Sequence, residues 1–113
     1  MENQIDYYEE TGKYRDKFDE GLPDLMAPYS TFRKGVYRDG ALNAKTKRLI
    51  ALAAGMTAGC TRCIIGQTKD AVKAGATRAE ILETTAVAIV MGGTAVSAES
   101  WRVVKALEEL GKW

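Results

Sequence analysis

The residues of this chain best suited to chemistry are its only two cysteines, Cys60 and Cys63. Two positions three apart share one face of a helix, with Cβ atoms about 5–6 Å apart, whereas a disulfide needs a Cβ separation of about 3.8 Å. In the loosely wound first turn of a helix, such a pair can close that gap and open it again. We therefore predict a reactive pair that cycles between dithiol and disulfide, and not a structural cross-link.

A helix that begins at this pair would make its thiols more acidic. Unpaired N–H groups and the positive end of the helix dipole lower a thiol pKa from about 8.5 toward neutrality. Arg62 lies between the cysteines and Lys69 follows one to two turns later, so the neighbourhood is basic. The helix start by itself favours Cys60 as the more acidic thiol.

The candidate site also includes Gly66 and Gln67, which follow Cys63 in the same predicted helix. Gln67 lies four positions further on, and therefore on the same helix face, while Gly66 beside it leaves room for a substrate. Two other interpretations of the cysteine pair stay open at this point. Both cysteines can be small core residues, or they can bind zinc together with the Cys-x-x-Cys of a second subunit.

The chain has no histidine among its 113 residues, and this absence excludes several kinds of site. A Ser-His-Asp triad, a histidine metal ligand and an imidazole general base are all impossible. The 16 basic and 15 acidic side chains give a net charge of +1, which favours neither a nucleic acid nor a membrane as a partner. We predict no metal and no cofactor.

Other polar residues have ordinary expected roles. We expect the basic face that precedes the cysteines to be solvated, and the tyrosines near the start of the chain to pack in the protein or at an interface rather than act as acid catalysts. These residues are Lys45, Lys47 and Arg48, and Tyr7, Tyr8 and Tyr14.

The elements that position the site are predicted to be helices in a single domain. Only two prolines occur, and no segment alternates apolar and polar residues over the length of a strand. Residues 1–39 form an N-terminal helical part of the same domain, and residues 40–113 form its core. The expected helices cover residues 5–20, 24–37 (interrupted or started late by Pro28), 45–54, 60–74, 77–91 and about 96–110.

Capping signals define several of these helices. Asn43 is expected to cap the third helix, Gly55 to Gly59 to end it, and Gly75 to end the fourth in a left-handed conformation. Thr77 and Glu80 form a capping box at the start of the fifth helix, which Gly92 and Gly93 end.

Two apolar patterns predict how the helices pack. The later part of the helix over residues 77–91 is apolar all round, as in a central buried helix. The last helix carries an apolar seam at spacings of four and three, suited to packing within or between subunits, formed by Val96, Ser100, Val103, Leu107 and Leu110. We predict a homo-oligomer.

The sequence also bears on location. The first ten residues are acidic and lack the basic and apolar parts of a secretory signal. The longest uncharged run, residues 84–98, is shorter than the roughly 20 residues that span a bilayer. We expect a soluble, cytoplasmic protein.

Residues 40–97 resemble the alkylhydroperoxidase AhpD-like, or carboxymuconolactone decarboxylase, family. The resemblance is carried by the Leu-x-x-Lys-x-Lys-Arg-Leu-Ile lead-in at residues 42–50, Cys60-x-x-Cys63, the segment 74–77 with Glu80 and Ile81, and the glycine pair at 92–93. It implies an AhpD-like helical bundle that assembles as a trimer or hexamer. It also implies a thiol peroxidase or disulfide reductase in which Cys63 attacks the peroxide, Cys60 resolves the sulfenic acid, and an external dithiol reduces the disulfide.

Two positions depart from the pattern of the peroxidatic members. Those members have a histidine four residues after the second cysteine, where this chain has Gln67, and a glutamate twelve residues before the first, where it has Arg48. Gln67 cannot take up a proton at neutral pH, whereas Arg48 can stabilise a thiolate by charge. Either activation relies on electrostatics, or the peroxidase activity is weak or lost; Glu80, Glu83 or a tyrosine is a candidate substitute as proton carrier.

The sequence thus favours a thiol-dependent oxidoreductase with Cys63, Cys60, Gln67 and Arg48 as its site. Two alternatives remain. One is a non-redox enzyme like carboxymuconolactone decarboxylase, in which Arg48 or Arg62 holds a carboxylate. The other is a non-catalytic oligomeric module of the same fold.

Overall fold

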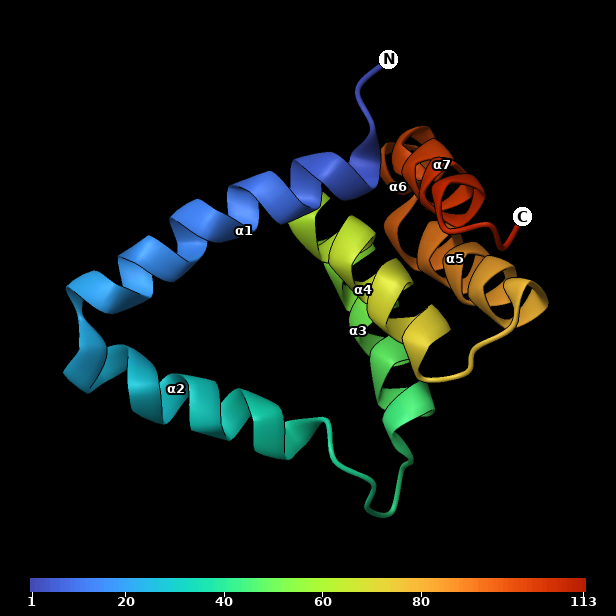
Figure 1. The fold of residues 1–113 in the computed structure, drawn as a ribbon. Helices are drawn as coiled ribbons and strands as arrows, with labels where there is room; N and C mark the ends of the chain where they lie inside the picture. Colours follow the sequence, from blue (N-terminus) through green and yellow to red (C-terminus); the bar gives the residue numbers. More distant parts are fainter.

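The computed structural model describes residues 1–113 and consists of seven helices without strands (Figure 1). The predicted all-α class is therefore confirmed. The helices are α1 (Gln4–Gly21), α2 (Pro23–Val36), α3 (Ala44–Thr57), α4 (Thr61–Lys73), α5 (Arg78–Gly92), α6 (Thr94–Glu99) and α7 (Trp101–Glu109).

The core lies among α3, α4, α5, α6 and α7. Helix α3 packs against both α4 and α5, while α7 covers another side of α4. Apolar side chains from all five helices meet there, and their removal from water is the main force that holds the helices together. The buried cluster comprises Leu52, Met56, Ile64, Ala71, Ile81, Ala88, Val96, Val103 and Leu107.

Helices α1 and α2 form a hairpin that projects from this core (Figure 1). The first half of α1 lies against α4 and α7, and the chain then turns so that α2 runs back toward the start of α3. No residue of α2 is buried. The predicted interruption at Pro28 is wrong, because α2 is continuous from Pro23; its exposure lets water replace the hydrogen bond that proline cannot donate.

The start of α1 is tied to the end of α7 by a buried carboxylate. Glu109, with a side chain 7% exposed, accepts hydrogen bonds from the backbone N–H groups of Gln4 at 3.0 Å and Ile5 at 2.8 Å. A carboxylate at this position satisfies N–H groups that the helix leaves unpaired and complements the positive end of its dipole. The first turn of α1 is thus fixed on the core.

Most predicted helix ends are confirmed. The side chain of Asn43 accepts a hydrogen bond from the backbone of Thr46, and Thr77 and Glu80 form the expected capping box. Gly75 has a φ of +96°, the left-handed conformation that favours glycine. Gly55, however, does not end α3, which continues to Thr57; its lack of a side chain serves close packing against α4.

Two predictions about the C-terminal helices need correction. Helix α5 is not buried on all sides, because Val87, Val90 and Met91 are 61%, 82% and 78% exposed. The expected single last helix is divided into α6 and α7 at Ser100, whose hydroxyl donates to the carbonyl of Ser97 and competes with the helical bonds. The seam itself packs within the subunit, since its members Val96, Val103 and Leu107 are buried.

None of the seven helices combines the length and the apolar character needed to span a membrane.

Candidate active site

The two cysteines lie at the beginning of α4, as predicted, and are joined by a disulfide. Cys60 is the N-cap residue, and its sulfur accepts a hydrogen bond from the backbone N–H of Cys63 at 3.2 Å. The two Cα atoms are 5.2 Å apart, within the usual range for a disulfide, so the first turn of the helix accommodates the bond. Both cysteines are half-buried.

The turn between α3 and α4 places the pair. Gly59 adopts a φ of +69°, and the N–H of Cys60 bonds to the carbonyl of Gly55 at 3.0 Å. A Cβ on Gly55 would lie only 2.7 Å from the Cβ of Cys63. Helix α3 therefore approaches the second cysteine as closely as a glycine permits.

Gln67 and Arg48 are brought together, although they are 19 positions apart. Gln67 is 7% exposed, and its Oε1 accepts a hydrogen bond from Nη1 of Arg48 at 3.2 Å. Its Nε2 donates to the hydroxyl of Tyr37 at 3.2 Å, which fixes the orientation of the amide. Arg48 also forms an ion pair with Asp70 at 3.2 Å and lies 3.5 Å from the centre of the Tyr37 ring. Neither Gln67 nor Arg48 hydrogen-bonds to a sulfur atom.

This cluster contains no side chain that exchanges a proton at neutral pH with the cysteines, and it holds the cation of Arg48 against α4. A neutral amide neither takes up nor releases a proton near pH 7. The cation of Arg48 is shared between a carboxylate, an amide oxygen and an aromatic face, interactions that together hold the guanidinium in place. The expectation of a solvated Arg48 is therefore wrong.

Arg62 and Lys69 connect α4 to α1. The guanidinium of Arg62 donates to the carbonyl of Tyr8 at 2.8 Å and to the hydroxyl of Thr11, and lies 4.4 Å from the centre of the Tyr8 ring. Lys69 forms an ion pair with Glu9. This contact raises the pKa of Lys69 and lowers that of Glu9, chiefly through their hydrogen bond. The positive charge of Lys69 is thus largely neutralised by α1.

The space beside Gly66 is occupied by Tyr8. A Cβ at position 66 would lie 2.5 Å from Cε2 of the Tyr8 ring. An aromatic side chain of α1 thus occupies the place of a side chain at position 66, while Gly66 still lines the open cavity at the disulfide described next. Tyr8 does pack, as predicted, but it packs at the site.

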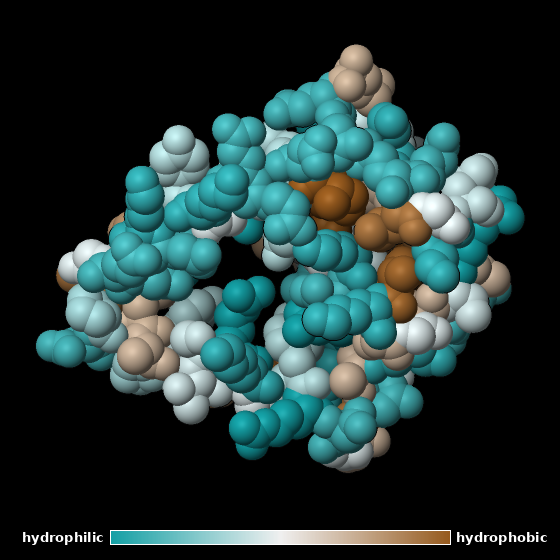
Figure 2. Space-filling view, in the orientation of Figure 1, coloured by the Kyte–Doolittle hydropathy of each residue, from teal (hydrophilic) through white to brown (hydrophobic).

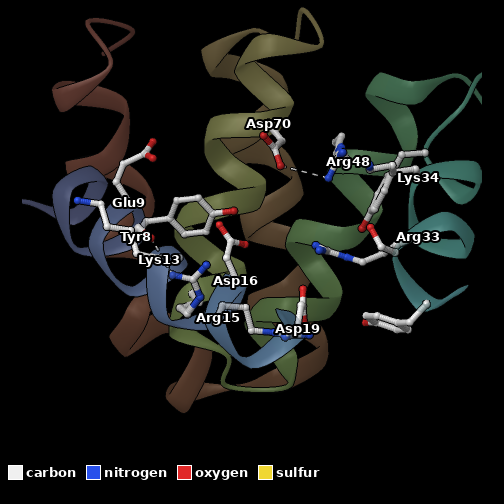
Figure 3. A pocket seen from close by; sticks show the side chains of 15 residues that line it. Tyr8, Glu9, Lys13, Arg15, Asp16, Asp19, Arg33, Lys34, Arg48 and Asp70 are labelled. Carbon is white, nitrogen blue, oxygen red and sulfur yellow. Dashed lines mark hydrogen bonds and ion pairs between the residues drawn. The ribbon is translucent and has the colours of Figure 1, made fainter. Parts of the chain in front are cut away.

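A cavity of about 660 Å³ opens at the disulfide between the hairpin and α3–α4. The space-filling view shows a hollow at this place, with mostly hydrophilic residues around its rim (Figure 2). Both cysteines and Gln67 line it, together with Tyr8 of α1, Tyr29 and Arg33 of α2, and Tyr37, which directly follows α2. A second, more highly charged cavity of about 520 Å³ adjoins it along the hairpin (Figure 3).

Sequence reasoning missed the contribution of α2 and of Asp70. Tyr37 and Arg33 line the cavity although they precede the cysteines by more than twenty residues, and no local pattern connects them to it. The candidate proton carriers Glu80 and Glu83 do not line it. Glu80 caps α5 and forms an ion pair with Lys45 at 2.9 Å, and both contacts lower its pKa, the Lys45 hydrogen bond most.

A model of the carboxymuconolactone decarboxylase family matches residues 23–106, which is more than half of the chain. The chain belongs to the carboxymuconolactone decarboxylase family. The match extends beyond residues 40–97 at both ends and includes α2, so the family assignment made from the cysteine motif is confirmed.

Solved structures of this family share the fold. A family protein from Legionella pneumophila, determined in its apo form, is 33% identical, with a TM-score of 0.89 over 98% of this chain and all of that chain. A family protein from Thermotoga maritima is 36% identical, with a TM-score of 0.73 over 77% of this chain and 90% of that chain. The AhpD-like bundle predicted from the sequence is thereby confirmed.

Two curated relatives have no assigned function. An uncharacterised protein of Cupriavidus necator is 37% identical over 66% of this chain and 66% of that protein, so the chain spans just under two thirds of its length. Uncharacterised protein 4 in the cox locus of Paracoccus denitrificans is 39% identical over 68% of this chain and 69% of that protein.

The packing of Tyr8 on Gly66 predicts that Gly66→Ala destabilises the protein. The added methyl group collides with a ring that Arg62 already holds from another side, and overpacking of this kind costs about 1–3 kcal/mol. Urea unfolding measures the loss. Gly35→Ala is the matched control, because a Cβ there meets nothing within 4 Å and alanine favours the helix. Equal stability of Gly66→Ala and wild type would contradict the described contact.

Proposed function

We propose that the chain is a thiol-dependent oxidoreductase that uses the Cys60–Cys63 pair to reduce a peroxide or a disulfide. The observation that carries this proposal is a disulfide in the first turn of a helix, at the floor of a cavity large enough for a small molecule. Reactive cysteines typically lie at helix N-termini in partly exposed, electropositive surroundings, whereas buried structural cysteines are inert. A role in the antioxidative response has been suggested for the similar Thermotoga protein.

The reaction with a peroxide has two steps in the protein. The thiolate of Cys63 attacks one peroxide oxygen, the O–O bond breaks, and the departing alkoxide takes up a proton to become an alcohol. Cys63 is then a sulfenic acid; the thiolate of Cys60 attacks its sulfur, the S–O bond breaks as the disulfide forms, and the departing hydroxide takes up a proton to become water. Two electrons pass from the thiols to the peroxide. An external dithiol returns the pair to its reduced form and itself becomes a disulfide.

Gln67 and Arg48 act as positioning residues in this proposal. Neither Gln67 nor Arg48 takes the thiol proton, because they stand where the peroxidatic members have a histidine and a glutamate. The thiolate is instead stabilised by the N-terminus of α4 and by the positive charge that Arg48 holds nearby. A cytoplasmic location would supply the reduced dithiols on which the second half-reaction depends.

Cysteine variants test the redox cycle. We expect wild type, supplied with dithiothreitol, to consume a hydroperoxide or a small disulfide over many turnovers. Cys63→Ser falls to the rate of the double serine variant, whereas reduced Cys60→Ser, freed of dithiothreitol, consumes one equivalent of hydroperoxide and ends in a sulfenic acid. Peroxide consumption and mass spectrometry measure these outcomes, and urea unfolding verifies that each variant is folded. If wild type is no faster than the double variant with either oxidant, the proposal is wrong.

The exposed apolar side chains support a homo-oligomer, a trimer or a hexamer as the family resemblance implies. Val90 and Met91 on α5, and Leu25 and Phe32 on α2, are each more than two thirds exposed. Large exposed apolar side chains gathered on a helix are typical of an interface. Association with other copies of the chain would cover it.

A charge on α5 tests the assembly. We expect Val90→Glu to lower the mass measured by light scattering, because a charge buried in an interface without a partner opposes association. Ala79→Glu is the matched control, since it adds the same charge to an exposed position in the first turn of the same helix. A monomeric wild type at micromolar concentration would contradict the proposed assembly.

A further inference from the structure

The wall of the cavity at the disulfide carries positive charge and no negative charge. Arg15, Arg33 and Arg62 line it, and no aspartate or glutamate does. Apart from Gln67 and the two cysteines, the rest of the lining is aromatic or apolar, including three tyrosines and alanines of α3. A ligand in this cavity can therefore contact the arginine side chains with a charged group and the tyrosines and alanines with an apolar group.

The three arginines differ in how far their charge is already used. Arg15 forms an ion pair with Asp19. Arg62 donates only to the carbonyl of Tyr8 and the hydroxyl of Thr11, so no carboxylate neutralises it. Arg33 forms no hydrogen bond, ion pair or stacking contact, and extends from α2 into the space between the hairpin and the core (Figure 3). Arg33 is thus the cation best placed to bind an added anion.

The carboxylates nearby do not cancel this charge. They line the adjoining cavity, and three of them are already held by cations: Glu9 by Lys69, Asp19 by Arg15 and Asp70 by Arg48. Asp16 alone has no ion pair there, and that cavity also contains the unpaired Lys13 and Lys34. Among the residues that line these two cavities, the unpaired positive charges therefore outnumber the unpaired negative ones.

We propose that the oxidised substrate of this site is a small organic anion, a carboxylate that carries a disulfide or hydroperoxide group on a short apolar chain. Arg33 binds the carboxylate, the tyrosines and alanines contact the apolar chain, and the reactive group reaches the cysteines. Arginine is suited to this task because its planar fork binds a carboxylate through two hydrogen bonds. The volume of about 660 Å³ fits a small molecule. The inference rests on the proposed redox function of the same site.

The reaction to be measured is thiol–disulfide exchange between the reduced protein and a probe disulfide. One cysteine thiolate attacks a sulfur of the probe, the S–S bond breaks, and one thiolate leaves. The second cysteine attacks the mixed disulfide and releases the other thiolate, so the protein becomes a disulfide and the probe becomes two thiols. Two electrons pass from protein to probe, and each released thiolate takes up a proton according to its pKa.

Dithiodipropionate and its diamide, dithiodipropionamide, are the matched probes, because they differ only in carboxylate against amide. For each probe, the rate constant for oxidising the reduced protein is divided by the rate constant for oxidising dithiothreitol. This correction removes the difference in intrinsic reactivity between the two probe disulfides. We expect wild type to prefer the dicarboxylate about tenfold on this corrected scale, the size expected from one charge-assisted hydrogen-bonded contact. Added salt lowers the preference, because Arg33 is exposed.

Two variants on α2 assign the effect to Arg33. Arg33→Gln reduces the dicarboxylate rate about tenfold more than the diamide rate, whereas Lys34→Gln, which removes the adjacent charge outside this cavity, leaves the wild-type preference unchanged. Arg33 has no partner in the fold, so its replacement leaves the structure intact. Equal corrected rates for the two probes in wild type, both faster than dithiothreitol, would overturn this inference and leave the redox function standing. Rates no faster than dithiothreitol with both probes, together with hydroperoxide consumption no faster than that of the double serine variant, would instead show that the proposed function has failed.

Discussion

The close contact between α3 and α4 at Gly55 and Cys63 is the constraint on which the site depends. Because position 55 has no side chain, the two helices meet at the second cysteine, and the turn between them delivers Cys60 to the N-cap of α4. The disulfide is therefore held between a rigid helix pair on one side and an open cavity on the other. The proposed redox cycle depends on this combination, because the sulfur atoms must be both held in place and reached by a substrate.

The hairpin of α1 and α2 supplies what the core lacks. Helix α1 covers one flank of α4, where Arg62 donates to the carbonyl of Tyr8. Tyr37, which directly follows α2, completes the cluster around Gln67. Gln67 replaces the histidine of the peroxidatic members with a neutral amide whose oxygen and nitrogen are both hydrogen-bonded. Arg48 replaces their glutamate with a cation held between a carboxylate and an aromatic ring. This arrangement offers no side chain of the pair as a proton acceptor.

Local signals in the sequence predicted local features of the structure. The cysteine pair, the Asn43 cap and the Thr77–Glu80 capping box each depend on residues within a few positions of one another, and each is present. The contacts of Tyr37 with Gln67 and of Tyr8 with Arg62 join residues 30 and 54 positions apart, so no spacing indicates them. The burial of α5 was predicted wrongly because an apolar sequence does not specify which of its faces the other helices of the subunit cover.

The most direct measurement of the central claim is the titration of the reduced pair, followed by the ultraviolet absorbance of the thiolate, with the double serine variant as the baseline for tyrosine. A pair activated by the start of α4 and by nearby arginines predicts that the first thiolate forms with an apparent pKa below about 8.5, the value of an ordinary thiol. An absorbance that rises only at or above that pH would contradict the claim, because the cysteines would then behave as unactivated side chains.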